Sequence, residues 1–165
     1  MLAFLPEGVP GLFQRGLAGA MIRLGDPRRP AWKVSEKPGA SAATRQTLLT
    51  HDDARYADET WWKQARPELA MGPASWGWIA AALASVARID APGYLEQVDV
   101  PAIILGTRAD RLVGWRAIER AHRRLPNSEL LMFGAEARHE ILRESDPVRN
   151  RALAAIDAFL DRTIG

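Results

Sequence analysis

The sequence predicts an α/β fold in which parallel strands with flanking helices follow a mainly helical region. Residues 101–110 and 130–139 each contain an apolar run that is typical of a buried strand, breaks at a glycine and leads to one polar side chain. A helical pattern follows each run, so the order is strand, helix, strand, helix. That order indicates one crossover unit of a parallel sheet.

The composition describes a chain with one ordinary hydrophobic core. Of its 165 residues, 47% are apolar and 25% are charged, which is typical of a globular protein. The absence of cysteine excludes disulfides and thiolate metal sites and favours the cytoplasm. Residues 1–24 lack the basic start of a signal peptide, and no apolar run is long enough to span a bilayer. We therefore expect a cytoplasmic protein, with membrane association as an alternative.

The first part of the chain is predicted to be helical, with one long loop. Residues 11–24 have loosely amphipathic spacing, whereas residues 26–43 are rich in proline, glycine and serine and indicate an exposed loop. Thr50 is a suitable N-cap for a helix that stops before the next proline. Ser75 is a suitable N-cap for a further helix over residues 76–89.

The second part of the chain carries the predicted strands. We expect strands over residues 100–105 and 129–133, with a helix over residues 115–125 between them. Asp146 is a suitable N-cap for the last helix, and Pro147 suits its first position. This last helix is predicted to bury a stripe made of Val148, Ala152, Ala155, Ile156, Phe159 and Leu160.

Two polar residues follow the predicted strands, and their chemistry is complementary. Asp110 follows the first strand and His139 follows the second, and in open α/β sheets catalytic groups gather at the carboxyl ends of strands. A carboxylate and an imidazole in this position are two members of a nucleophile–histidine–acid triad. Ser41 and Ser75 do not match a nucleophile on a sharp strand-to-helix turn, so the third member is missing.

Four segments carry a resemblance to a known family; they are LTHDDARY at 49–56, PELAMGPASWGW at 67–78, APGY at 91–94 and ARHEIL at 137–142. With them the chain resembles the lysophospholipase and monoacylglycerol-lipase-like group of α/β-hydrolases, most clearly over residues 49–161. The resemblance implies ester hydrolysis through an acyl-enzyme, with Asp110 as the triad acid and His139 as the base. The family's serine lies in a Gly-x-Ser-x-Gly turn upstream of a helical cap, so this chain is expected to be the carboxyl-terminal half of such an enzyme.

This resemblance divides the chain into three expected regions. They are a cap entry helix and loop over residues 1–49, a helical cap over residues 50–97, and the end of the hydrolase core over residues 98–165. Trp76 and Trp78 belong to the cap, where they either bind the acyl chain of a substrate or simply pack its core.

The expected partners follow from the same division. They are a lipid or small ester substrate and the missing half of the fold, without metal, cofactor or nucleic acid. Because a two-stranded sheet leaves its edges open, self-association is also expected. The alternative is a catalytically inactive domain that binds a partner or a lipid surface, and the helix over residues 11–24 suggests weak membrane-surface contact.

Overall fold

The structure is a computed structural model and describes residues 11–32, 42–70 and 72–164. Its α-helices and strands, in chain order, are α1 (Gly11–Arg23), α2 (Ala42–Leu49), α3 (Asp53–Ala65), α4 (Trp76–Asp90), β1 (Ala102–Thr107), α5 (Trp115–Arg124), β2 (Ser128–Phe133) and α6 (Asp146–Ile164). Three short 3₁₀ helices join them, at Pro67–Leu69, Leu95–Gln97 and Ile141–Arg143.

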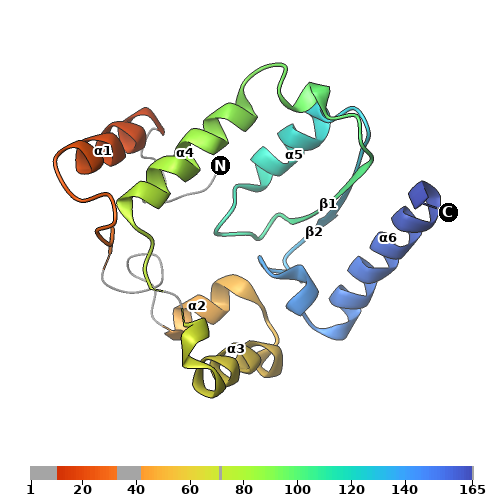
Figure 1. The fold of residues 1–165 in the computed structure, drawn as a ribbon. Helices are drawn as coiled ribbons and strands as arrows, with labels where there is room; N and C mark the ends of the chain where they lie inside the picture. Colours follow the sequence, from red (N-terminus) through yellow and green to blue (C-terminus); the bar gives the residue numbers. More distant parts are fainter. Residues whose placement is uncertain (1–10, 33–41, 71, 165) are drawn as a thin grey trace.

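Strands β1 and β2 are parallel, as the sequence predicts, and lie between two helices. They pair in register from Ala102 opposite Ser128 to Thr107 opposite Phe133. Figure 1 shows α5 and α6 on opposite sides of this pair. Gly106 faces α5 so closely that a β-carbon there would lie 3.2 Å from the side chain of Ile118. Strand β1 starts two residues later than predicted, because Pro101 has no N–H to donate to a neighbouring strand.

The core beside α6 joins the end of β2 to the loop that follows it. Its buried members are Phe133, Ala137, Ile141, Val148 and Ala152, with Leu105 and Leu131 packed against them. Of the stripe predicted for α6, the structure buries Val148, Ala152 and Phe159, whereas Leu160 is exposed.

A second core lies between α1 and α4. Its buried members are Ala18 of α1 and Ile79 and Leu83 of α4, and Trp76 packs against them. Ser75 caps α4 as predicted, since its hydroxyl accepts a hydrogen bond from the N–H of Trp78 at 3.2 Å. Helices α1 and α4 lie apart from the strands in Figure 1. The division of the chain into regions at residues 49 and 97 stays a prediction.

Three local predictions in the helical parts are wrong. Helix α2 matches no predicted helix and begins inside the predicted loop. Asp52, not Thr50, caps α3, because the Thr50 hydroxyl donates instead to the Arg143 carbonyl oxygen at 2.7 Å. Asp146 is the first residue of α6 rather than its cap, and its carboxylate pairs with Arg55.

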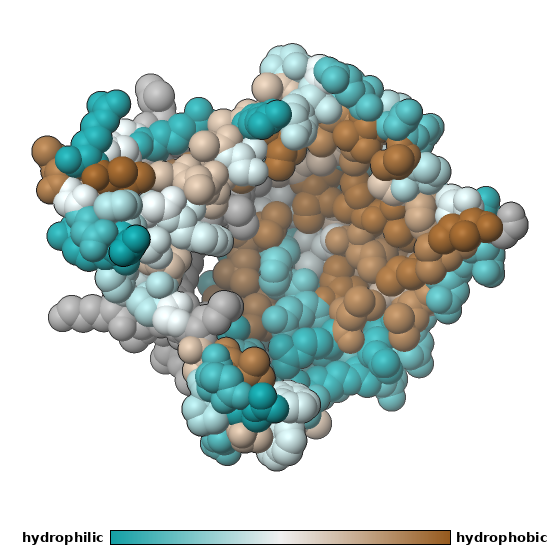
Figure 2. Space-filling model, in the orientation of Figure 1, coloured by the Kyte–Doolittle hydropathy of each residue, from teal (hydrophilic) through white to brown (hydrophobic). Residues whose placement is uncertain are grey.

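An apolar hollow lies on the face of the molecule that carries β1, β2 and α6 (Figure 2). Part of it is a groove of about 320 Å³ whose lining includes Ile103, Leu131, Ala155 and Ala158. Within the described residues, no helix combines the length and the hydropathy that a membrane crossing requires.

Candidate active site

The loop after β1 fixes the carboxylate of Asp110. Its Oδ1 accepts hydrogen bonds from the N–H groups of Leu112 at 2.8 Å and Val113 at 2.9 Å, which is a turn that aspartate favours. The side chain is only 5% exposed, so few alternative orientations are open to it. The second oxygen, Oδ2, is left to face the loop that follows β2.

That second loop carries His139. Ala137 and Ile141, two residues before and two residues after the histidine, are buried in the core beside α6. Because both neighbours are anchored there, the histidine backbone is held at the rim of the sheet. The His139 side chain stays 36% exposed, so its ring can be reached from outside.

The two side chains meet, with Nδ1 of His139 2.8 Å from Oδ2 of Asp110. Burial acts to raise the pKa of Asp110, but the hydrogen bonds from His139 and the two backbone N–H groups outweigh it and leave that pKa below its ordinary value. The hydrogen bond to Asp110 raises the pKa of His139 above its ordinary value, against the opposite effect of burial. An ionised carboxylate only accepts hydrogen bonds, so Nδ1 carries the proton and Nε2 of the neutral ring is free to accept one.

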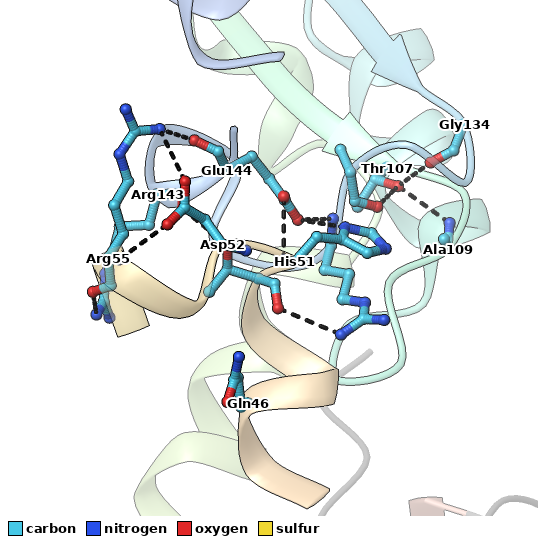
Figure 3. Close-up of polar contacts among 12 residues, drawn as sticks. Gln46, His51, Asp52, Arg55, Thr107, Ala109, Gly134, Arg143 and Glu144 are labelled. Carbon is cyan, nitrogen blue, oxygen red and sulfur yellow. Dashed lines mark hydrogen bonds and ion pairs between the residues drawn. The ribbon is translucent and has the colours of Figure 1, made fainter. Parts of the chain in front are cut away.

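One hydroxyl group connects the two loops. The Thr107 hydroxyl, at the end of β1, donates to the carbonyl oxygens of Ala137 at 2.8 Å and Gly134 at 2.9 Å. It also accepts the N–H of Ala109 at 3.1 Å, next to Asp110 (Figure 3). The threonine thus ties the start of the aspartate loop to the start of the histidine loop.

A further contact surface for the histidine loop comes from the corner between α2 and α3. The N–H of His139 donates to the carbonyl of Leu48 at 3.4 Å, and the N–H of Glu140 donates to that of Leu49 at 2.8 Å. No local sequence pattern indicates these contacts, because the partners are about 90 positions apart. The only sequence signal was the presence of both segments among the four that carry the family resemblance.

The other candidates from the sequence lie elsewhere. Trp76 packs in the α1–α4 core and Trp78 is 54% exposed, and their role in substrate binding stays a prediction. Ser75 acts as a helix cap, and Ser41 lies outside the described residues. In the part of the chain that the structure describes, no group of three histidine or acidic residues could hold a metal ion.

Comparisons with known proteins found one similar curated protein and similar solved structures. The chain is 25% identical over 95 residues to a probable lysophospholipase L2 of Haemophilus influenzae. The matched residues make up 58% of this chain and 29% of that protein. The chain superimposes with a TM-score of 0.62 on a soluble variant of monoglyceride lipase from Saccharomyces cerevisiae, with 20% identity, over 90% of this chain and 48% of that one. No family model matches the chain.

The chain thus spans less than a third of the curated relative and about half of the yeast lipase chain. The structural likeness identifies the parallel pair and its helices as part of an α/β-hydrolase fold. Over this partial region, the chain is similar in sequence to a lysophospholipase and in fold to a monoglyceride lipase, which agrees with the resemblance carried by the four sequence segments.

Proposed function

We propose that this chain is the acid- and base-bearing part of a serine ester hydrolase whose nucleophile comes from a segment outside the sequence. The observation that carries the proposal is the 2.8 Å contact between Nδ1 of His139 and Oδ2 of Asp110. This contact lies at the carboxyl ends of adjacent parallel strands, where α/β folds collect catalytic groups.

The pair has the properties that acyl transfer requires. Nε2 of His139 would remove the proton from a serine hydroxyl as its oxygen attacks the ester carbonyl, and Asp110 would stabilise the imidazolium that forms. The imidazolium would then return the proton to the departing alcohol. A water molecule, activated by the same nitrogen, would hydrolyse the acyl-enzyme and restore the serine.

The apolar face beside α6 supports the expectation that more of the sheet docks here. A two-stranded sheet has open edges and buries little apolar surface, and β1 and β2 form a sheet of only two strands in the described chain. Ile103 and Leu131 line the groove on this face and would be buried by additional strands and helices. The occupant that we propose is the serine-bearing half of the same fold.

Complementation tests this proposal directly. The chain would be co-expressed with the segment encoded immediately upstream, and hydrolysis of p-nitrophenyl butyrate would be followed. We expect activity that His139→Ala and Asp110→Asn reduce by about a thousandfold or more, as in other triads. Glu68→Gln, which removes an exposed charge paired with Arg66 away from the groove, is the matched control and should leave the rate unchanged.

Two results would count against the hydrolase. One is an upstream segment without a strand followed by Gly-x-Ser-x-Gly. The other is an active complex whose rate does not respond to His139→Ala and Asp110→Asn. If activity is found, comparing a monoacylglycerol with a lysophospholipid would assign the substrate, because the two relatives are named for these two classes of lipid.

The alternative function is a non-enzymatic domain that binds a lipid surface. Helix α1 favours it, since Phe13 is 63% exposed, Leu24 beyond its end is 88% exposed, and Arg15 and Arg23 are exposed as well. Co-sedimentation with phosphatidylglycerol vesicles at low salt is the test. Binding that Phe13→Asp abolishes would support this alternative, and the absence of binding would remove it.

A further inference from the structure

A second histidine–carboxylate contact, between His51 and Glu144, lies next to the loop that carries His139. Glu144 follows the histidine loop, and its side chain is fully buried, with 0% exposure. Its Oε1 accepts the N–H of Arg138 at 2.8 Å and lies 3.0 Å from Nδ1 of His51, while Oε2 accepts the N–H of His51 at 3.1 Å. Figure 3 shows the Glu144 carboxylate directed at His51. Both oxygens therefore face N–H donors, which is the environment that a buried carboxylate requires.

The donors to Glu144 come from two segments that are far apart in the sequence. Arg138 immediately precedes His139, whereas His51 belongs to the corner between α2 and α3. Two further bonds close the same junction: the Thr50 hydroxyl donates to the Arg143 carbonyl at 2.7 Å, and the Arg138 guanidinium donates to the Thr50 carbonyl at 3.2 Å. The buried carboxylate is the point where both segments converge.

We propose that Glu144 is a positioning residue for His139. By holding the N–H of Arg138 and both donors of His51 on one carboxylate, it fixes the backbone of the histidine loop against the α2–α3 corner. The His139 ring then extends from a fixed backbone toward Asp110. The inference rests on the proposed function for its catalytic meaning, but its geometry can be tested in the chain alone.

Glu144→Gln is the sharpest perturbation, because glutamine has the shape of glutamate but only one acceptor oxygen. In either orientation, its NH₂ group faces an N–H donor, which is His51 on one side and both Arg138 and His51 on the other. The loop has to move to relieve this repulsion. We expect the Asp110–His139 hydrogen bond to weaken, and the pKa of His139 to fall by about half a pH unit or more.

The measurement is an NMR titration of the chain with ¹⁵N-labelled histidine, in which the three imidazoles are assigned from single His→Asn variants. Glu140→Gln is the matched control, because the charge of Glu140 itself helps to raise the pKa of His139. The Glu140→Gln variant therefore shows how far the pKa of His139 falls when a neighbouring charge is lost and the buried contacts of Glu144 are kept. The proposal requires a larger fall in Glu144→Gln than in Glu140→Gln, and equal falls would overturn it.

If Glu144→Gln does not fold, His51→Ala carries the test. The His51 side chain is 38% exposed, so its removal is better tolerated, and it releases Glu144 from the ring while Arg138 remains bound. A smaller fall in the pKa of His139 is expected, and an unchanged pKa would overturn the proposal. In the complemented enzyme, Glu144→Gln should lower kcat with little change in KM. Since the titration needs no serine, it decides this inference even where complementation yields no activity.

Discussion

The Thr107 hydroxyl connects the Asp110 loop to the His139 loop, and Thr107→Val removes it with little change of shape. The side chain is 1% exposed, so water does not replace the lost partners. Valine keeps the branched side chain that suits a strand. The change therefore isolates the hydrogen bonds of one buried oxygen, since its methyl groups occupy nearly the same space.

The magnitude follows from the partners of that oxygen. One hydroxyl hydrogen is shared between the carbonyls of Gly134 and Ala137, so these two contacts count as about one hydrogen bond, and the N–H of Ala109 supplies a second. Each contributes about 1 kcal/mol net, with more where a buried group is left unpaired. We expect Thr107→Val to lower the free energy of unfolding by about 2 kcal/mol.

Urea unfolding followed by circular dichroism measures this change, at one fixed protein concentration because self-association would shift the midpoint. Thr107→Ser keeps the hydroxyl and should lose only about 0.8 kcal/mol for the missing methyl group. Thr163→Val removes an exposed hydroxyl at the end of α6 and should change stability by less than about 0.5 kcal/mol. A Thr107→Val variant as stable as the Thr163→Val control would refute the connecting role.

Three further predictions concern other parts of the fold. Phe133→Ala should lower the free energy of unfolding by about 3–5 kcal/mol in the same assay, because Phe133 is 1% exposed in the core beside α6. Ser75→Ala should cost about 1 kcal/mol through loss of the α4 cap, with the helix otherwise retained in the circular dichroism spectrum. The Asp110–His139 pair should stabilise the fold fully between about pH 4 and pH 6.5, because the pKa of Asp110 is lowered and that of His139 is raised. Its contribution, measured as the difference in stability between wild type and Asp110→Asn, should decline below that window as Asp110 is protonated and above it as His139 loses its proton.

The proximity of Asp110 and His139 could be predicted from the sequence because it depends on one rule. Adjacent parallel strands end at the same edge of a sheet, so polar residues a few positions beyond two such strands come together. The strands themselves were recognisable from continuous apolar runs that end in glycine. The structure confirms that the pair meets, whereas its catalytic role stays a prediction that complementation tests.

Helix α2 and the role of Thr50 could not be predicted in the same way. The eight residues of α2, Ala42–Leu49, have little amphipathic character, so their helix depends on tertiary contacts rather than on a local pattern. Local rules favour Thr50 as the cap of α3. In the structure its hydroxyl has a partner 93 positions away, and Asp52 caps the helix instead. The long-range hydrogen bond of Thr50 to Arg143 therefore replaces the capping role that local rules favour.

The same contrast explains why the pair is visible in the sequence and its support is not. Asp110 and His139 are placed by strand ends, which local apolar patterns reveal. Thr107 and Glu144 act mainly through backbone groups, and a backbone N–H or carbonyl leaves no residue type to recognise. The described fold therefore holds its histidine loop from two sides, with β1 on one and the α2–α3 corner on the other. Because the supports use different residues, Thr107→Val and Glu144→Gln should each weaken the Asp110–His139 contact, and a double variant should show whether the two supports act independently.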